Sequence, residues 1–479
     1  MGGDRPARRR GAGADGDGPD PVGRRGARQE LPIGSIRRRR HHPHPQHHHR
    51  QRGVQDDGLR HGLLLRGDRA GHARAGAAHL AGAGGAGADR GGRARRGGGG
   101  AVILVVNTGS SSIKVAIFDD ALQQRLSGAA DGIGAAAGGL KVGEVTREAQ
   151  FANHVAALQA VLEQLEAQGF PVSRLRATAH RVVHGGARLT EPVRIDDAVV
   201  AEIARCNPLA PLHNPHNLAA INALRDLAPD LAHFASFDTA FHATNPPVAT
   251  TYAVPPAITE RGIRRYGFHG ISYASLTRAL PGIAGGTLPR RVLAFHLGNG
   301  ASLCAIRDGR SVATTMGYSP LSGLTMGTRT GDIDGNAVLR MAEEDGIDAA
   351  ARLLNHESGL TGLSGVGPDM RTLLGDSSPE AAFAVDHFCY WARRHAGSMI
   401  AAMEGVDALA FTGGIGENAT TVRARIMEGL EWTGLVPDAN AAGAARLHAP
   451  GSSVGAWVVP AAEERMIAAD AAALLDADA

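Results

Sequence analysis

Residues 101–118 read AVILVVNTGSSSIKVAIF, and this stretch decides the fold. Ala101–Val106 and Ile113–Phe118 are apolar runs of strand length, and the turn-forming residues Asn107–Ser112 separate them. The same pattern of strand, polar turn and strand returns about half-way along the rest of the chain, in Arg291–His296, Leu297–Ala301 and Ser302–Arg307. We therefore expect two copies of one α/β domain, each of which opens with a β-hairpin.

Helices are expected between these strands. In residues 381–403 apolar side chains recur at three- and four-residue intervals, which is typical of one amphipathic helix. A buried strand, Val406–Phe411, then enters a glycine-rich turn, Thr412–Asn418. Two further helices are expected at Asn153–Gln168 and Ala198–Cys206. The alternation of strands and helices predicts an α/β protein, with a first domain over residues 101–240 and a second from residue 241.

The first 100 residues have a different composition from the rest. This leader holds 21 of the 50 basic and 9 of the 47 acidic residues, a net charge of +12, whereas the other 379 residues hold 29 basic and 38 acidic residues, a net of −9. It is rich in Arg, Gly, Ala and His, so it cannot bury enough apolar surface to offset the entropy of folding, and we expect disorder. Three interpretations stay open: an artefact of an upstream start assignment, a disordered tail without a specific role, or an arm that binds nucleic acid or metal.

Composition also indicates where in the cell the protein is expected. No run of about 18 apolar residues exists to span a membrane, so we expect a soluble protein with no membrane partner. The basic pI of about 9.0 comes from the leader alone and gives no reason to expect specific nucleic-acid binding by the folded part. Cys206, Cys304 and Cys389 lie far apart, which suits a reducing cytoplasm and provides no zinc or haem motif.

Three glycine-rich turns follow predicted strands, at Asn107–Ser112, His296–Gly300 and Gly413–Asn418. Glycine lets backbone N–H groups approach phosphate oxygens, so three such turns favour a nucleotide site over three plain hairpin turns. No lysine stands in a P-loop pattern. Residues 414–419 also match a dinucleotide fingerprint, but the acidic residue that this motif needs could only be Glu428 or Glu431, inside another helix-like stretch.

Two arginines lie next to glycines and are expected in loops. Arg181 stands in the run HRVVHGG and Arg329 in the run GTRTGD. A guanidinium binds carboxylates and phosphates through two parallel hydrogen bonds, although a solvated surface arginine is the alternative for each. Other His, Asp and aromatic residues follow turns in Pro211–Pro215, Phe237–His242 and Tyr266–Gly270.

Taken in this order, these stretches closely resemble the acetate kinase family, of the superfamily that also contains sugar kinases, heat-shock chaperone ATPases and actin. The resemblance runs from Val102 to about Asp470. It implies a duplicated α/β kinase whose first domain is completed by residues 463–479 and whose second spans 241–462. It also implies ATP or ADP and acetate or another short-chain carboxylate in the cleft, Mg²⁺ or Mn²⁺, and a cytoplasmic homodimer.

The resemblance implies a role for individual residues. The catalytic group would be Arg181, Asp238, His269 and Arg329. The substrate would contact Lys114, Arg181, Val183, Leu212, His213, Phe268 and Pro320, of which Val183, Leu212, Phe268 and Pro320 would form an apolar pocket for the methyl group. The nucleotide would contact His296, Leu297, Gly298, Asn299, Gly300, Asp369, Met370, Arg371, Gly414, Ile415, Gly416, Glu417 and Asn418. The metal would be held by Asn107 and Glu463.

Two departures from the family pattern stand out. The family usually has Phe-His-Gly-Thr-Ser-His, whereas this chain has Tyr273 in place of the second His. It usually has Thr-Asn-Glu-Glu near the end, whereas this chain has Ala461-Ala462-Glu463-Glu464, which leaves the choice between the two glutamates open.

Charge suggests a mechanism. A carboxylate substrate is ionised at pH 7 and can attack phosphorus without a general base, so the enzyme must supply positive charge and alignment. The alternatives are a sugar kinase, in which an Asp activates a hydroxyl, and a nucleotide-switched binding protein of the chaperone or actin type. The two arginines and the apolar pocket argue against both. The choice among acetate, propionate and butyrate, and the physiological direction, stay open.

Overall fold

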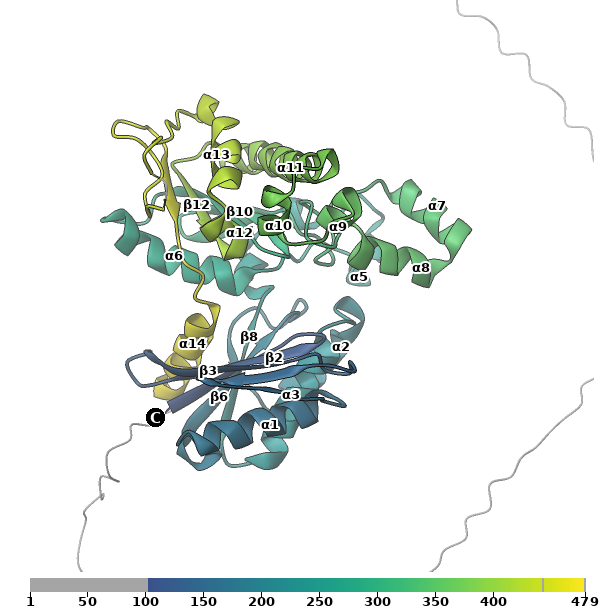
Figure 1. The fold of residues 1–479 in the computed structure, drawn as a ribbon, viewed down its shortest axis with the longest axis vertical. Coiled ribbons are helices and arrows are strands. Elements are labelled where there is room, and N and C mark those ends of the chain that lie inside the picture. Colours follow the sequence, from purple (N-terminus) through teal and green to yellow (C-terminus); the bar gives the residue numbers. More distant parts are fainter. Residues whose placement is uncertain (1–101, 442, 478–479) are drawn as a thin grey trace, which may run out of the picture. The chain divides into compact units, whose positions relative to one another are not determined.

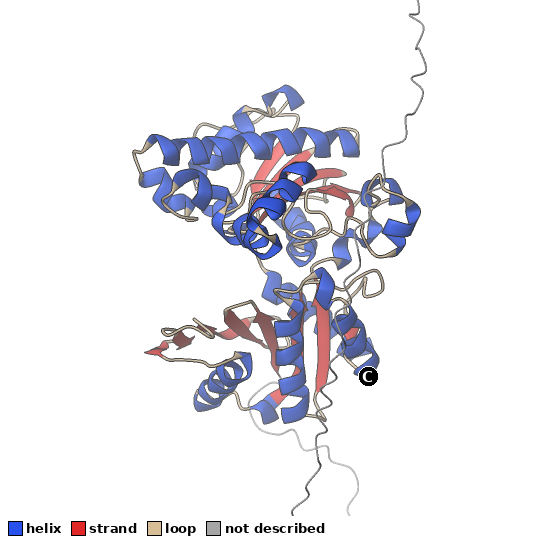
Figure 2. Cartoon of the chain, turned by 90° about the vertical axis from the view of Figure 1, so that its right-hand side faces the viewer, coloured by secondary structure: helices blue, strands red, loops and turns tan. Residues whose placement is uncertain are grey.

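The computed structural model describes residues 102–441 and 443–477, and the leader lies outside the described residues. Two β-sheets, each with helices packed against it, make up the described part (Figures 1 and 2). The first sheet has the strands β1 (Val102–Thr108), β2 (Ser112–Phe118), β3 (Gln124–Asp131), β4 (Gly139–Val142), β5 (Val145–Glu148), β6 (Leu175–Val182), β7 (Val193–Arg194) and β8 (Ala232–Phe237). The second has β9 (Arg291–Leu297), β10 (Ala301–Arg307), β11 (Arg310–Thr314), β12 (Ala408–Thr412) and β13 (Gly455–Val458).

Helices connect and cover the strands. They are α1 (His154–Ala167), α2 (Asp197–Arg205), α3 (Asn214–Leu227), α4 (Pro247–Thr250), α5 (Pro256–Glu260), α6 (Gly270–Ala284), α7 (Gly335–Asp345), α8 (Ile347–Arg352), α9 (Gly359–Ser364), α10 (Met370–Gly375), α11 (Pro379–Met403), α12 (Gly413–Asn418), α13 (Thr420–Glu428) and α14 (Glu463–Ala477). None of the helices in the described part of the chain is both long and apolar enough to cross a membrane.

The strand order confirms the duplicated α/β fold. The first sheet runs β5-β4-β3-β2-β1-β6-β8-β7 and the second β11-β10-β9-β12-β13. In each sheet the hairpin strands pair antiparallel, while the first strand pairs parallel with a later one: β1 with β6, and β9 with β12. A further parallel strand, β8 or β13, follows on that side. The order β3-β2-β1-β6-β8 therefore repeats as β11-β10-β9-β12-β13.

The first sheet buries both of its faces. Along β1, Leu104 and Val106 pack with α1 and α3, whereas Ile103 and Val105 point the other way and pack with α14 (Figure 1). This alternation follows from the two-residue period of a strand. Burying one such Val, Ile or Leu side chain contributes about 1.5–3 kcal/mol, so an apolar strand covered on two sides is strongly fixed.

The helix α14 comes from the C-terminal end but packs on the first sheet. Its Met466, Ile467 and Ala471 belong to the same buried cluster as Ile103 and Val105 of β1. We propose on this contact that residues 463–479 complete the first domain, 101–240, and that residues 241–462 form the second.

The second sheet is covered by α11 on one face and by α6 on the other. The helix α11 begins after the N-cap Ser378, whose hydroxyl accepts from the Ala381 N–H, and ends at Glu404 in the left-handed conformation. Its buried residues recur at three- and four-residue spacing and pack in one cluster with Phe295 and Phe411, whose rings stack at 4.6 Å. The predicted helix over 381–403 is therefore confirmed, with two more residues at its start.

Two local predictions are wrong. The expected turn Thr412–Asn418 is mostly the short helix α12, which begins at Gly413 with a φ of 80°. A Cβ there would lie 2.8 Å from the Leu297 carbonyl oxygen, so glycine allows α12 to start directly against β9. Arg181, expected in a loop because glycines follow it, is instead the last but one residue of β6. Its side chain is therefore fixed by a strand.

Candidate active site

Three neighbouring strands of the first sheet end on polar side chains that contact one another. Asn107 of β1 and Arg181 of β6 are register partners, and Asp238 follows the end of β8. The Arg181 guanidinium donates from Nη1 to Asn107 Oδ1 at 3.0 Å and from Nε to Asp238 Oδ1 at 3.1 Å, and Nη2 donates to Asp238 Oδ2. The carboxyl ends of parallel strands are a common place for ligand sites. The fold thus builds a bidentate Arg–Asp pair at that place.

Burial shapes the electrostatics of this pair. The Asp238 side chain is only 3 % exposed and that of Arg181 20 %. Burial opposes the charge of Arg181, but the Asp238 carboxylate outweighs it and raises the Arg181 pKa. Burial raises the pKa of Asp238, and the guanidinium offsets part of that shift. Both oxygens of Asp238 accept hydrogen bonds from Arg181, so this carboxylate fixes the orientation of the guanidinium.

His269 lies at the N-terminus of α6 in the left-handed conformation, with a φ of 59°. The next residue, Gly270, donates its N–H to the Asp238 carbonyl at 2.8 Å, and a Cβ at Gly270 would lie 2.3 Å from that oxygen. The close approach fixes His269 next to the Asp238 loop. Its ring stacks on that of His296 with 4.0 Å between centroids.

The imidazole of His269 is neutral at physiological pH. Burial, the neighbouring His296 and the charges of Arg181 and Arg329 hold its pKa well below 6.5. The Nδ1 atom is bonded to Ser302 Oγ at 2.8 Å. The other nitrogen, Nε2, faces Gly300, where an added Cβ would lie 3.3 Å from it.

Arg329 approaches the same point from the loop before α7. A Cβ at Gly300 would lie 3.6 Å from Arg329 Nη1, so the guanidinium and His269 Nε2 converge there. Burial and the charge of Arg181 lower the pKa of Arg329. Nη1 donates to the Pro320 carbonyl at 3.4 Å, and Arg329 forms no ion pair with any residue of 102–441 or 443–477. Arg329 is therefore a partly buried cation, close to a second one, that lacks a counter-ion in the described part.

The glycine-rich loops of the second sheet surround a pocket of about 670 Å³. Its lining includes eight of the predicted nucleotide contacts: Gly298, Asn299, Asp369, Met370, Arg371, Gly414, Ile415 and Asn418. The other five, His296, Leu297, Gly300, Gly416 and Glu417, are not among its lining residues. Glu417 instead accepts the N–H groups of Gly413 and Ala461 and so holds α12 in place. The structure therefore brings three separate segments to one pocket: the turn at residues 298–299, the start of α10 and the helix α12.

The residues predicted to contact the substrate are placed unevenly. Val183 and Phe268 are buried in one cluster, whereas Leu212 is 44 % exposed. Burial lowers the pKa of His213 to about 4, and the nearby charges of Arg329 and Arg181 contribute to this shift. Lys114 is exposed on β2, as the register partner of Asn107, and Pro320 meets Arg329 through its carbonyl.

The chemistry of the two predicted metal ligands fits Mg²⁺. Glu463 begins α14, and its Oε1 lies 4.0 Å from His296 Nδ1. Burial raises the pKa of Glu463, while Arg181 and Lys114 act in the opposite direction. No group of three or more His, Cys, Asp or Glu side chains in the described residues could hold a metal. Mg²⁺ commonly binds through one or two protein oxygens together with phosphates and water, and a carboxylate and an amide oxygen are ligands of that kind.

The sequence reasoning missed Ser302 and the role of Tyr273. Ser302 is the register partner of His296 in the second hairpin and is fully buried. Tyr273 was noted only as a departure from the family pattern, and its hydroxyl contacts Ser302 Oγ at 2.5 Å. The two-residue period of β10 places Ser302 on the same face as Cys304, which packs in one cluster with Tyr273 of α6. This period can be read from the sequence.

The two-sheet fold and the cluster of arginine, histidine and aspartate define a phosphotransferase of the α/β kinase class. Residues 102–469 match the model of the Acetokinase family. The acetate kinase of Rhodopseudomonas palustris strain TIE-1 is 44 % identical over 392 residues, which cover 77 % of this chain and 96 % of that protein. The chain therefore belongs to the Acetokinase family, and it is a phosphotransferase with a carboxyl group as acceptor.

Other relatives agree with this family. The propionate kinase of Yersinia enterocolitica is 42 % identical over 388 residues, which cover 77 % of this chain and 94 % of that one. The crystal structure of Porphyromonas gingivalis acetate kinase has a TM-score of 0.72 at 34 % identity and covers 77 % of this chain and 98 % of that one.

Proposed function

We propose that this chain catalyses the reversible transfer of the γ-phosphoryl group of ATP to acetate, giving acetyl phosphate and ADP, with Mg²⁺ or Mn²⁺. The family membership supports the reaction type. The observation that carries the proposal is the convergence of His269 Nε2 and the Arg329 guanidinium at Gly300, with Arg181 close by. Positive charge without a counter-ion is what a phosphoryl group requires as it moves between two anions.

The reaction needs no general base. Acetate has an acidity comparable to that of Glu and is ionised at pH 7. One carboxylate oxygen forms the new bond to the γ-phosphorus, and the bond from that phosphorus to the bridging oxygen breaks, so the electron pair leaves with ADP. Arg181, Arg329 and the Nε2–H of His269 would neutralise the charge that spreads over the equatorial oxygens.

Asp238 supports a carboxylate acceptor over a sugar hydroxyl. A sugar kinase needs a free carboxylate to take the hydroxyl proton. Here Arg181 donates to both oxygens of Asp238, which is a holding role. We propose that Asp238 orients Arg181, that His213 lines the site near both arginines, and that Val183, Leu212, Phe268 and Pro320 surround the methyl group.

The nucleotide is proposed to bind at the pocket of the second sheet. Two of the three segments that line it contain a glycine, Gly298 and Gly414, where a phosphate can approach the backbone closely. Asn107 and Glu463 would hold Mg²⁺, which supplies Lewis-acid charge to the phosphate oxygens when bound. Lys114 adds a further cation on the Asn107 side of the site.

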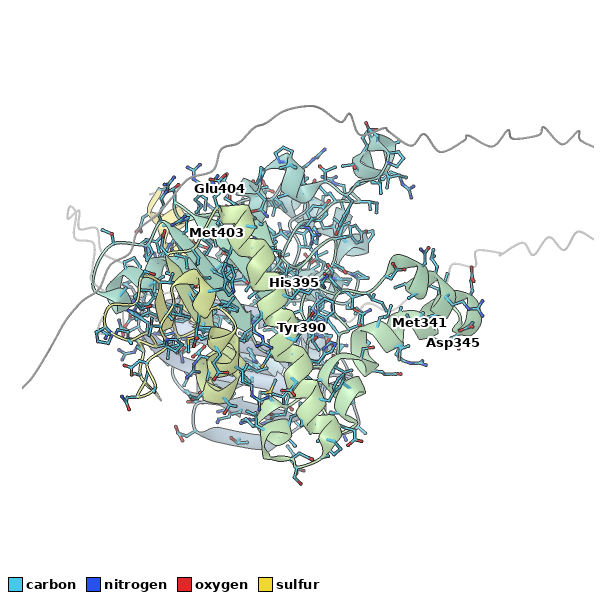
Figure 3. All side chains as sticks on the ribbon, turned by 90° about the horizontal axis from the view of Figure 1, so that it is seen from above. Met341, Asp345, Tyr390, His395, Met403 and Glu404 are labelled. Atoms are coloured by element: carbon cyan, nitrogen blue, oxygen red, sulfur yellow. The ribbon has the colours of Figure 1, made fainter. Side chains whose placement is uncertain are left out.

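Self-association is a further part of the proposal. The long helix α11 crosses the second sheet, and Figure 3 shows Tyr390 and His395 along it. Phe383 and Tyr390, seven residues apart on α11, and Leu339 of α7 are each more than half exposed. Such exposed apolar side chains support a homodimer. The free, buried Cys206, Cys304 and Cys389 support a cytoplasmic location.

The test measures ADP formation from ATP and Mg²⁺ by the purified full chain, and any acyl phosphate is trapped as the hydroxamate. Acetate, propionate, butyrate, glycerol and a hexose are compared at equal concentration. We expect product with a short-chain carboxylate and none with glycerol. Since each methylene changes binding by about 1–3 kcal/mol in an apolar pocket, the same assay ranks the three acids. Phosphorylation of glycerol or a hexose, with none of acetate, would overturn the proposal.

A further inference from the structure

A chain of buried hydroxyls runs from Tyr273 to the imidazole of His269. The Tyr273 hydroxyl contacts Ser302 Oγ at 2.5 Å, and Ser302 Oγ contacts His269 Nδ1 at 2.8 Å. Tyr273 and Ser302 are both fully buried. No bulk water reaches these hydroxyls, so their protons must find acceptors within the protein.

Only one donor–acceptor direction along these hydrogen bonds gives the Tyr273 and Ser302 protons an acceptor each. Ser302 is the one acceptor recorded among the described residues for the Tyr273 proton, so the phenol donates to Ser302 Oγ. If Ser302 also accepted from His269 Nδ1–H, its own proton would have no partner. Ser302 therefore donates to Nδ1, which must carry a lone pair.

The consequence concerns the other ring nitrogen. A neutral imidazole whose Nδ1 accepts a hydrogen bond carries its proton on Nε2. Nε2 is the atom that faces Gly300 and the Arg329 guanidinium. The opposite tautomer would present a lone pair there and repel an anionic phosphoryl oxygen.

We propose that Tyr273 and Ser302 are positioning residues that fix His269 as the Nε2–H tautomer, so that it donates to the phosphoryl group during transfer. This inference rests on the proposed function. It assigns a role to Tyr273, the residue at which this protein departs from the family pattern. The phenol of Tyr273 sets the direction in which the hydrogen bonds to Ser302 and His269 are donated. Burial supports it, because it raises the pKa of Tyr273 well above 10 and keeps the donor protonated.

The first test compares kinetics of Tyr273→Phe with those of the wild type. The phenylalanine keeps the ring in its pocket and removes one donor. Since one hydrogen bond is worth about 0.5–1.5 kcal/mol, we expect kcat to fall about 3- to 10-fold, with KM values changed less than about twofold. The matched control is Tyr266→Phe, a buried tyrosine whose hydroxyl donates to the Gly262 carbonyl at 3.1 Å, and its kcat should stay at the wild-type value.

The second test reads the tautomer directly, without turnover. Long-range ¹H–¹⁵N NMR of ¹⁵N-histidine-labelled protein distinguishes protonated from unprotonated ring nitrogens, and the spectrum of His269→Gln identifies the His269 signals. We expect an unprotonated Nδ1 in the wild type and a partly protonated Nδ1 in Tyr273→Phe. A protonated Nδ1 in the wild type overturns the proposal, and so does a lower kcat in Tyr273→Phe with an unchanged tautomer.

Ser302→Ala provides the same test if Tyr273→Phe does not fold. It removes the link itself, so the double variant Tyr273→Phe/Ser302→Ala should have the same kcat as Ser302→Ala alone. Additive losses of kcat would show that the two hydroxyls act separately, and would overturn the proposal that Tyr273 acts on His269 through Ser302. A wild-type chain that forms no acetyl phosphate contradicts the proposed function, whereas an unchanged tautomer and kcat in both single variants contradict the positioning role of Tyr273 and Ser302 alone.

Discussion

The two sheets have the same strand order, but their corresponding ends carry different chemistry. In the first sheet, β1 and β6 end on the side chains Asn107 and Arg181, which bind each other. In the second, the equivalent register partners are His296 of β9 and Thr412 of β12, and these strands continue into the glycine turn 298–300 and the glycine-rich start of α12. The first sheet thus presents polar and charged side chains at its strand ends, whereas the second presents backbone N–H groups at glycines. The repeated strand order thus provides two equivalent positions that carry different chemistry.

The difference has a physical reason. A migrating phosphoryl group needs strong, directed charge, which guanidinium groups provide. A nucleotide needs a pocket into which backbone N–H groups can reach, and side chains would fill that space. If this division is correct, a change at the Arg181 end of the first sheet lowers kcat, and a change at the pocket glycines beside the second sheet raises the KM for ATP.

The largest effect is expected at Arg181. Under the proposed mechanism its removal takes away a transition-state donor, and it leaves the buried Asp238 carboxylate unpaired. We expect Arg181→Ala to lower kcat by about 10² to 10³ and the free energy of unfolding by about 3–5 kcal/mol. Kinetics and urea denaturation measure the two losses. Arg181→Ala/Asp238→Asn should recover part of the stability but not the activity. If stability and activity recover together, Arg181 is structural only.

Arg329 should show the loss of activity without the loss of stability. It has no ionic partner in the described residues, and burial with the nearby Arg181 lowers its pKa. We expect Arg329→Ala to lower kcat by about 10² to 10³ with an unchanged or slightly higher melting temperature. The control is Arg340→Ala on the exposed surface of α7, where neither quantity should change. An unaltered kcat in folded Arg329→Ala would assign this arginine to the surface.

A smaller effect is expected at the second sheet. Gly414 lines the pocket, and a Cβ there meets no protein atom within 4 Å, so it would occupy the space of the nucleotide. We expect Gly414→Ala to raise the KM for ATP about tenfold, which corresponds to about 1.4 kcal/mol, while kcat changes little. Gly282→Ala on α6 also meets no atom within 4 Å and lies outside this pocket, so it serves as the control. A lower kcat at constant KM would contradict the division between the sheets.

A separate effect concerns the pH dependence of stability. Burial lowers the pKa of His242 to about 4, whereas the unfolded side chain titrates near 6.5. Between these values the unfolded state binds more protons, so stability is complete above pH 6.5 and falls as the pH decreases toward 4. The slope is about 1.4 kcal/mol per pH unit for one such group. Denaturation of His242→Asn should show a shallower dependence than the wild type, and the exposed His356→Asn should match the wild type.

Much of this fold could be predicted from local sequence patterns. The hairpins at residues 101–118 and 291–307 and the helix α11 have clear periods, and the structure has them within two residues. The conformation of Arg181 could not be predicted from neighbours, because pairing with β1 overrides the influence of the glycines that follow it. The contact of Tyr273 with Ser302 joins residues 29 apart through the packing of α6 on the second sheet, which no local pattern contains.

The most direct test of the account is acetyl phosphate formation by the wild type and Asp238→Asn across pH 6 to 8. If Asp238 holds Arg181 and removes no proton, both proteins should give a flat kcat profile, and the variant should keep activity within about tenfold of the wild type. If Asp238 is a general base, the variant should lose about 10² to 10⁴ in rate. A loss of that size, together with a fall in kcat toward the acid end of the range that only the wild type shows, would contradict the account.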